Sequence, residues 1–383
     1  MRYSQSGIKT RRIADSSVTG RMIAAGIAEQ TSAGSWMMLP LGALVLRRLE
    51  TLVRNCMTRA GAVEVTLPVI QPADVWMRTG RWETYGDEMW RLSNRDGQKF
   101  CLAPTHEEMA ARYAASRLTS WRDVPQTVFQ IGSKFRDELR PRHGLVRARE
   151  FTMKDAYSFD LTEQGMRDSY DRMAGAYAEL MSELGIEPVV LHADNGQMGG
   201  SFSQEILCLH PDGEERVAFD DTSGWRRSDD GQRALEIAHI FQLGQRFTEA
   251  AGAYAAGRDG ERTLLWMGCY GIGLSRLISA MVHVHGDDDG CGWPAAVAPW
   301  TYAVLPATDD HAAQAGEVYN RMLRAGHRVM LDDRGLRLGR AIKDHKLIGV
   351  PETIIVGRDA LAGWLEIETR DGGKRQARLD ELT

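Results

Sequence analysis

Apolar residues recur at every third or fourth position between residues 40 and 60, which is the period of an amphipathic helix. The residues on the shared face are Val45, Leu49, Leu52, Val53 and Cys56. Gly61 follows, where glycine commonly ends a helix. A second helical pattern covers residues 163–184 and ends at Gly185. We therefore predict two long helices, each with one buried face.

Strands are predicted where β-branched and aromatic residues gather between turn residues. The longest pair, residues 120–138 and 148–160, flanks the loop LRPRHG and is expected to form a hairpin. Shorter strands are expected over residues 62–70, 187–194, 215–221, 236–244 and 264–273, the last leading into a buried helix. Pro68 lacks an N–H group near the end of the first of these, which indicates a sheet edge or an interface.

The pattern changes after Pro299, where strands and helices alternate in the order β-α-β-α-β. Such alternation is typical of a small parallel sheet. The preceding segment GWPAAVAP is the expected linker. We predict an α+β fold with two domains: a mostly antiparallel body over residues 1–295 and a small α/β domain over residues 296–383.

Composition narrows the class of protein. No apolar run is long enough to span a bilayer, and the polar N-terminus has no apolar signal segment, so we expect a cytoplasmic protein without a membrane partner. The 5 cysteines are scattered without a CxxC pair, which favours reduced thiols over disulfides or a zinc site. The net charge is −5, so any polyanion must bind at a local basic patch.

One such patch is KFRDELRPRHGLVRAREF, from Lys134 to Phe151. Alternate residues share a face of a strand, so closing the hairpin collects one set of side chains on one surface. The set is Arg136, Glu138, Arg147 and Phe151. Guanidinium groups bind phosphate oxygens, a carboxylate accepts the adenine amine, and an aromatic ring stacks on a base, so the set suits a nucleoside triphosphate. The alternative is a solvated hairpin held by weak surface ion pairs.

Two further segments carry candidate chemistry. In MGCYGIGLSR, glycines precede a helix whose first turn holds Arg276, where an anion could be shared with the helix N-terminus. The alternative is a glycine turn with an exposed arginine. In LAPTHEE, an extended loop would direct Thr105 and Glu107 to one point, suited to an amine. The alternative is a helix capping box formed by Thr105 and Glu108.

Together these segments resemble a known family. LPVIQPADVW, FRDE with VRAREF, and GCYGIGLSR are similar, in order, to the three signatures of class II aminoacyl-tRNA synthetases. PTHEE, MKDAYSF, AHIFQLG, DDR and LIGVP resemble blocks of bacterial prolyl-tRNA synthetases. The resemblance covers nearly the whole chain. It implies an antiparallel catalytic domain flanked by helices and a C-terminal anticodon-binding domain.

The resemblance also implies roles for single residues. Arg136 and Arg276 would be catalytic, and ATP would be bound by Arg136, Glu138, Arg147, Phe151 and Arg276. Proline would be bound by Thr105, Glu107, Arg136, Tyr157, Ser201 and Gln204. Mg²⁺ would accompany ATP, held mainly by phosphates and water rather than by a protein metal site. The remaining implied partners are tRNA(Pro) and a second copy of the chain, with Pro68 at the dimer interface.

The chain departs from the family pattern in several places. The segment between the second and third signatures is too short for the editing domain of many bacterial relatives, so some mischarging with alanine is expected. Gln204 stands where His is usual and Ala238 where Gly is usual. In the segment 335–342, Leu336 and Leu338 replace the usual Glu and Pro, which would alter anticodon reading or be drift in a loop.

Three hypotheses remain open from the sequence. The first is a short-form ligase that charges tRNA(Pro) with proline. The second is a paralogue that activates a proline analogue, serves another acceptor, or acts as an inhibitor-resistant duplicate. The third is an inactive tRNA-binding module, which the retained ATP arginines disfavour.

Overall fold

The computed structural model of the protein describes residues 1–382, and the chain forms two compact units. The core unit consists of residues 32–35 and 50–280, and the terminal unit of residues 1–31, 36–49 and 281 onward. Two helices, α2 (Pro40–Arg59) and α8 (Leu274–His285), contribute to both. Within residues 1–382, no helix is both long and apolar enough to cross a membrane.

The core unit is built on a nine-stranded sheet whose central strands are antiparallel. The strands are β12 (Gly224–Arg227), β11 (Glu215–Asp220), β13 (Gln232–Gly244), β16 (Trp266–Gly273), β8 (Glu150–Asp160), β7 (Gln126–Phe135) and β3 (Val63–Glu64), with β10 (Phe202–Leu209) on β13 and β9 (Val189–His192) on β10. Only β3 joins its neighbour in parallel. The predicted antiparallel body is confirmed.

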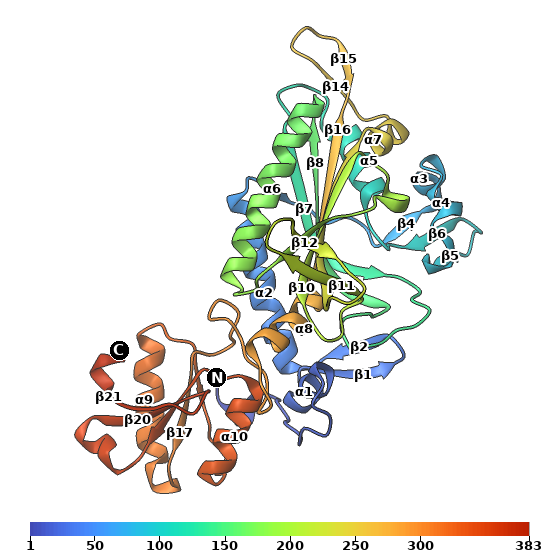
Figure 1. The fold of residues 1–383 in the computed structure, drawn as a ribbon. Helices are drawn as coiled ribbons and strands as arrows, with labels where there is room; N and C mark the ends of the chain where they lie inside the picture. The colour runs from blue at the N-terminus through green and yellow to red at the C-terminus, as the bar shows by residue number, and fades with distance from the viewer. Residues whose placement is uncertain (383) are drawn as a thin grey trace. The chain divides into compact units, whose positions relative to one another are not determined.

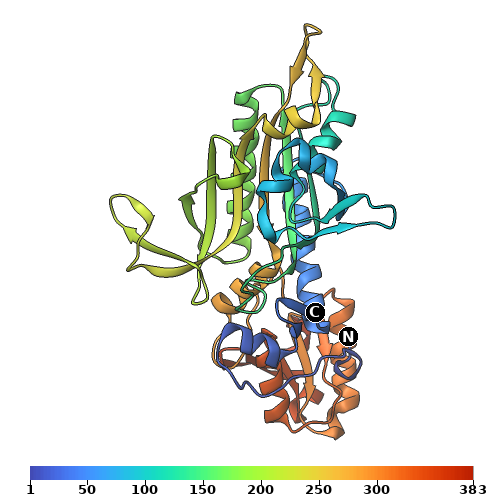
Figure 2. The same cartoon turned by 90° about the vertical axis from the view of Figure 1, so that its right-hand side faces the viewer.

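Helix α6 (Glu163–Glu183) covers one face of this sheet, and a smaller layer lies on the other (Figures 1 and 2). The hydroxyl of Thr162 accepts a hydrogen bond from the Gly165 N–H at 3.0 Å and so caps α6. The opposite layer contains α3 (Ala73–Arg78), α4 (Arg81–Thr84), α5 (Glu107–Arg117), α7 (Arg246–Ala251) and a small sheet of β4 (Ile70–Pro72), β5 (Arg91–Ser93) and β6 (Lys99–Leu102). A separate hairpin is formed by β14 (Tyr254–Ala256) and β15 (Arg262–Leu264).

The segment 62–70 differs from the single strand that its pattern predicts. It pairs with the large sheet only over β3, and β4 begins at Ile70 in the small sheet. Between them the N–H of Leu67 is bound by the side chain of Gln130 at 2.9 Å, and Pro68 has no N–H to donate. The backbone therefore stops pairing with β7 in the segment between β3 and β4.

The terminal unit contains the predicted parallel strands β18 (Val329–Leu331), β17 (Tyr302–Pro306) and β19 (Glu352–Val356). Helices α9 (Ala312–Arg324) and α10 (Leu338–Ile348) connect them, and α1 (Val18–Ala25), with the first residues of the chain, belongs to the same unit. Two antiparallel strands that the sequence pattern did not reveal extend the sheet, β20 (Trp364–Thr369) and β21 (Lys374–Arg378). The strands β1 (Ala28–Ser32) and β2 (Ser35–Met38) form a separate two-stranded sheet. The boundary at residue 295 stays a prediction.

Candidate active site

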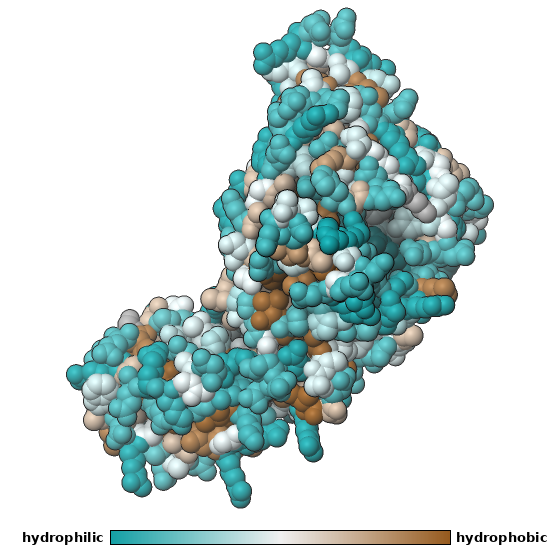
Figure 3. All heavy atoms as spheres, in the orientation of Figure 1, coloured by the Kyte–Doolittle hydropathy of each residue, from teal (hydrophilic) through white to brown (hydrophobic). Residues whose placement is uncertain are grey.

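A pocket of about 600 Å³ opens on the face of the core sheet away from α6. This volume lies within the usual range for ligand pockets. The surface of the core unit in Figure 3 is mostly hydrophilic, with apolar residues in small groups. Seven of the residues predicted to bind substrates line the pocket: Thr105, Glu107, Arg136, Glu138, Arg147, Phe151 and Arg276.

The β7–β8 hairpin supplies one wall. Lys134 pairs with Phe151 in its register, and just beyond β7 the N–H of Arg136 donates to the Arg149 carbonyl at 3.0 Å. The Arg136 guanidinium lies 5.3 Å from the centre of the Phe151 ring and donates to the Pro104 carbonyl at 3.4 Å. The guanidinium is thus fixed between an aromatic face and a backbone oxygen.

Arg147 is held by two carboxylates. Its Nε lies 2.6 Å from Glu138 Oε2, and its Nη1 lies 2.6 Å from Glu214 Oε1. Burial opposes ionisation of Glu138, but hydrogen bonds from Arg147 and from the Arg140 backbone lower its pKa. The anions around Arg147 therefore occupy positions that a phosphate could take.

Arg276 lies at the start of α8. Its Nε donates to the Val146 carbonyl at 3.0 Å, and its Nη1 lies 3.0 Å from the Glu236 carbonyl and 3.2 Å from Glu236 Oε2. Burial opposes ionisation of Glu236, but the His239 hydrogen bond and the Arg276 charge bring its pKa to about 2. The pocket thus holds a second arginine–carboxylate pair.

Thr105 and Glu107 meet at the inner end of the pocket. The Thr105 hydroxyl donates to Glu107 Oε1 at 2.8 Å, and both residues are buried. The alternative capping box is not formed, because His106 is the N-cap of α5 and its side chain makes no capping bond. Burial raises the pKa of the Cys269 thiol well above its usual value, so the thiol stays protonated and donates to Glu107 Oε1 at 3.2 Å. Glu107 is an oriented, buried anion.

Comparisons with known proteins agree with this geometry. The model of the tRNA synthetase class II core domain (G, H, P, S and T) matches residues 90–285, and that of the anticodon binding domain matches residues 301–382. The proline–tRNA ligase of Rhizorhabdus wittichii is 37% identical over 92% of this chain and 91% of its own length. That of Zymomonas mobilis is 36% identical over 93% and 90%. The chain belongs to the proline–tRNA ligase family.

Solved structures of this family share the fold. The prolyl-tRNA synthetase of Giardia lamblia in complex with prolyl-adenylate has a TM-score of 0.83 at 22% identity, covering 98% of this chain and 77% of that one. The enzyme of Cryptosporidium parvum with halofuginone and AMPPNP has a TM-score of 0.82 at 19% identity, covering 99% and 76%. The bacterial relatives align over about nine tenths of their length.

Three of the residues implied by the family resemblance lie outside the lining of the pocket. Tyr157 is fully buried, and its hydroxyl donates to Asp155 at 2.7 Å and accepts from the His106 N–H at 3.2 Å. Gln204 accepts a hydrogen bond from Tyr170 of α6 at 2.8 Å, on the opposite face of the sheet. Ser201 is exposed, and its N–H donates to the Gln242 carbonyl.

Other residues line the pocket without a signal in the sequence. Asp194, Asn195, Gly196 and Met198 come from the loop before β10, where the pattern predicted only the end of a strand. Arg81 forms ion pairs with Glu107 and Glu108 although its segment, GRWETYG, contains no recognisable pattern. Long-range pairs of this kind depend on the fold and are invisible to local periodicity.

A buried network supports the floor of the pocket. Asp155 lines it, and its Oδ1 lies 2.7 Å from Lys134 Nζ while its Oδ2 accepts from Gln130 at 3.0 Å. Lys134 is fully buried, so it is not part of the basic surface that the hairpin pattern suggested. Its charge instead neutralises the Asp155 carboxylate, whose pKa stays low despite burial.

Proposed function

We propose that the protein activates proline with ATP and transfers the prolyl group to tRNA(Pro). The observation that carries this proposal is the convergence of Thr105, Glu107, Arg136, Arg147 and Arg276 on one pocket in a chain of this family. Proline is a secondary ammonium ion and a carboxylate, and the pocket offers a buried carboxylate and a guanidinium for these two ends.

The amine of proline binds at Glu107. Its two N–H groups donate to the Glu107 carboxylate and the Thr105 hydroxyl oxygen, which are already oriented toward one another. The substrate carboxylate and the α-phosphate bind Arg136. A proline carboxylate oxygen then attacks the α-phosphorus, the bond to the β-phosphate oxygen breaks, and pyrophosphate leaves. Positioning and charge stabilisation suffice for this step, without a covalent protein nucleophile.

Glu138 and Phe151 receive the adenine ring, the first by accepting the exocyclic amine and the second by stacking. Arg147 and Arg276 hold the outer phosphates, and to do so they exchange carboxylate oxygens for phosphate oxygens. In the second step a terminal ribose hydroxyl of tRNA(Pro) attacks the prolyl carbonyl, and AMP leaves. Arg140 and Arg142 of the hairpin loop would contact the acceptor end of the tRNA, for which Arg142 would exchange its ion pair with Glu214, at 2.9 Å, for a phosphate.

The pocket fits Mg²⁺ delivered with ATP. Among residues 1–382 there is no group of three carboxylate, His or Cys side chains able to hold a metal. The nearby carboxylates Glu138 and Glu236 are each paired with an arginine. Mg²⁺ would be held mainly by phosphates and water, and it would neutralise charge on the departing pyrophosphate.

We infer further that the enzyme is a homodimer that works in the cytoplasm, where the reduced state of its five buried cysteines would be maintained. The exposed Pro68 lies beside Ile70, which is 56% exposed, and near Val63, which is 54% exposed. These residues leave an apolar strip beside the edge strand β3, suited to a second copy of the chain.

The test is amino-acid-dependent exchange between ATP and pyrophosphate, with proline, alanine, cysteine and ring-substituted prolines, followed by charging of tRNA(Pro). We expect proline to be preferred and alanine to be activated weakly. Preference for a ring-substituted analogue would favour the paralogue hypothesis instead. Gln204 bonds to Tyr170 of α6 rather than lining the pocket, which favours proline over an analogue, and the altered segment 335–342 remains as the other motivation for the paralogue.

A further inference from the structure

Arg81 is a buried cation with two anionic partners. Its side chain is 1% exposed, and its Nη1 lies 3.2 Å from Glu107 Oε2 and 3.0 Å from Glu108 Oε1. The guanidinium carbon also lies 4.9 Å from the ring of Trp76, 5.4 Å from that of Tyr85 and 5.3 Å from that of Phe247. These aromatic walls hold the cation in place, so the two carboxylates must share it.

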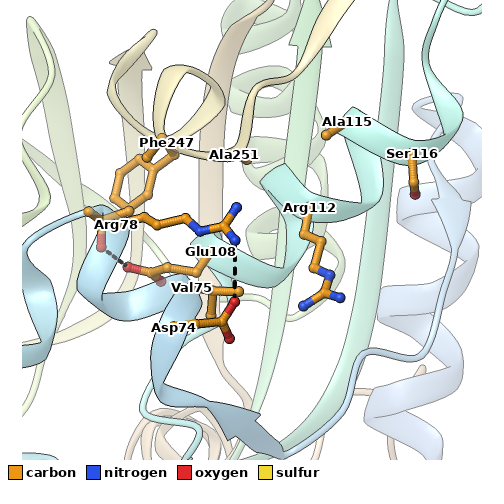
Figure 4. Close-up of a pocket in the computed structure, with 11 residues that line it drawn as sticks. Asp74, Val75, Arg78, Glu108, Arg112, Ala115, Ser116, Phe247 and Ala251 are labelled. Carbon is orange, nitrogen blue, oxygen red and sulfur yellow. Dashed lines mark hydrogen bonds and ion pairs between the residues drawn. The ribbon is translucent and has the colours of Figure 1, made fainter.

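Glu107 and Glu108 occupy different surroundings. Glu107 lines the active-site pocket, whereas Glu108 lines a neighbouring side pocket of about 280 Å³. Figure 4 shows Glu108 in that side pocket together with Asp74, Arg78 and Phe247. The Thr79 hydroxyl donates to Glu108 Oε1 at 3.0 Å. Arg81 therefore links the amine-binding carboxylate to a second carboxylate outside the active site.

We propose that Arg81 and Glu108 are positioning residues for Glu107, and that the charge on Glu108 sets how strongly the active site binds the amine of its substrate. The proposal rests on the function proposed above, in which Glu107 binds the proline amine. Neither residue needs to touch the substrate, because both act through Glu107.

The net charge of Arg81, Glu107 and Glu108 explains why the ionisation of Glu108 should change the affinity for the substrate amine. With both carboxylates ionised, one cation faces two anions, and the cluster keeps one net negative charge for the incoming ammonium ion. When Glu108 is neutral, Arg81 pairs with Glu107 alone and cancels its charge. A buried amine then loses most of its electrostatic attraction, because charges interact strongly where water is excluded.

The surroundings of Glu108 place its ionisation near neutral pH. Burial and the neighbouring Glu107 charge raise its pKa to about 7, although Arg81 and the Thr79 hydrogen bond oppose the shift. The Cys101 thiol also faces it, and burial raises the pKa of that thiol to about 12, so it stays neutral. Asp74, Arg78 and Arg112 are the other charged residues of the side pocket. As pH falls through 7, Glu108 loses its charge and proline binding should weaken.

The experiment measures KM for proline by ATP–pyrophosphate exchange between pH 6 and pH 8.5, with KM for ATP as an internal reference. In the wild type we expect KM for proline to rise as pH falls, while KM for ATP changes less than twofold. Glu108→Gln should raise KM for proline about tenfold at pH 8, equivalent to about 1.4 kcal/mol. It should also abolish the pH dependence, which a purely structural role would not do.

Asp74→Asn is the matched control, since it removes a carboxylate from the same side pocket whose ion-pair partner is Arg78. This variant should leave the dependence of KM for proline on pH unchanged. Thr79→Val is a second test that does not depend on the folding of Glu108→Gln. Loss of the Thr79 hydrogen bond disfavours the charged form, so the profile should shift to higher pH.

Lys154 is the competing source of a pH effect, because burial lowers its pKa to about 7. It lies on the other face of the sheet, bonded to Tyr177 of α6. A wild-type profile that persists in Glu108→Gln would overturn the proposal, as would an unshifted profile in Thr79→Val. Absence of proline-dependent exchange in the wild type would instead reject the proposed function itself.

Discussion

At the scale of single residues, the pocket combines two kinds of charged side chain. Some are held in place by several hydrogen bonds, and others would change their ion-pair partner when a substrate binds. Glu107 is fixed, since the Thr105 hydroxyl, the Cys269 thiol and the Arg81 guanidinium all donate to it. Arg147 is exchangeable, because its partners Glu138 and Glu214 are both partly exposed and can separate from it. These two kinds of residue predict different mutational effects.

Glu107→Gln should raise KM for proline at least about 30-fold, because truncating one partner of a buried charge pair costs about 2 kcal/mol or more. KM for ATP should stay close to that of the wild type, since the residues proposed to bind adenine and phosphate lie elsewhere in the pocket. ATP–pyrophosphate exchange at several proline concentrations measures both values. Glu163→Gln, on the exposed start of α6, is the control. An unchanged KM for proline would remove Glu107 from the amino-acid site.

Glu214→Gln should lower KM for ATP by about two- to threefold, as expected when a partly exposed ion pair worth about 0.5 kcal/mol no longer competes for Arg147. The neighbouring Glu215→Gln is a matched control, because Glu215 pairs with Arg227 and not with Arg147. Steady-state exchange with varied ATP distinguishes the two variants. A higher KM in Glu214→Gln would mean that Glu214 holds Arg147 in the productive orientation.

At the scale of elements, the segment between β3 and β4 matters because it joins no sheet. The exposed apolar residues Val63 and Ile70 lie at its two ends, in β3 and β4. Gln130, which binds the Leu67 N–H, also bonds to Asp155 in the floor of the pocket. A partner chain that packs on this segment would therefore stabilise an element connected to the active site by two hydrogen bonds.

Ile70→Asp should shift the protein from dimer to monomer, since it places a charge in the proposed apolar interface. Size-exclusion chromatography with light scattering measures the mass directly. Leu361→Asp is the control, because Leu361 is 88% exposed in the terminal unit, away from this strip in the sequence. A dimer that survives Ile70→Asp at micromolar concentration would place the interface elsewhere.

Elements were predictable where their pattern is local. The β7–β8 hairpin, α6 and the parallel strands of the terminal unit follow from period and turn residues, and all are confirmed. The strand β20 was missed although Leu365 and Ile367 alternate with charged residues, whereas β21 offers only one buried apolar residue, Ala377. The convergence of the hairpin side chains on one pocket was predicted, although Arg136, Glu138 and Arg147 lie beyond the ends of β7 and β8 and are not placed by strand alternation alone. The contacts of Arg81 and the orientation of Gln204 were not, since each depends on an element distant in sequence.

At the scale of the whole molecule, several carboxylates are ionised inside paired networks in both units. Asp155 in the core unit and Asp332 in the terminal unit both have a pKa below the usual value, because Lys134 in one case and Arg334 with His345 in the other outweigh the cost of burial. A lowered pKa in the folded state stabilises the fold above the unfolded value of about 4, and that stabilisation is lost as pH falls further.

The thermal unfolding midpoint should therefore change little between pH 7 and pH 5 on account of these groups and fall steeply below about pH 4. Asp332→Asn should lower stability at pH 7 by about 3 kcal/mol, because it removes the buried carboxylate that pairs with both Arg334 and His345. The same variant should lose less stability on acidification than the wild type does. Scanning calorimetry at pH 7, 5 and 3.5 measures both effects. Equal acid sensitivity in the two proteins would contradict this account.

The carboxylates around Arg147 and Arg276 act as built-in counterions. In the proposed function, each arginine exchanges one anionic neighbour for another when a nucleotide binds, so the number of paired charges should hardly change. Dissolved ions then screen the starting state and the bound state to a similar extent. The affinity for ATP should consequently depend only weakly on ionic strength. A site whose arginines are solvated and unpaired before the ligand binds would show a stronger dependence.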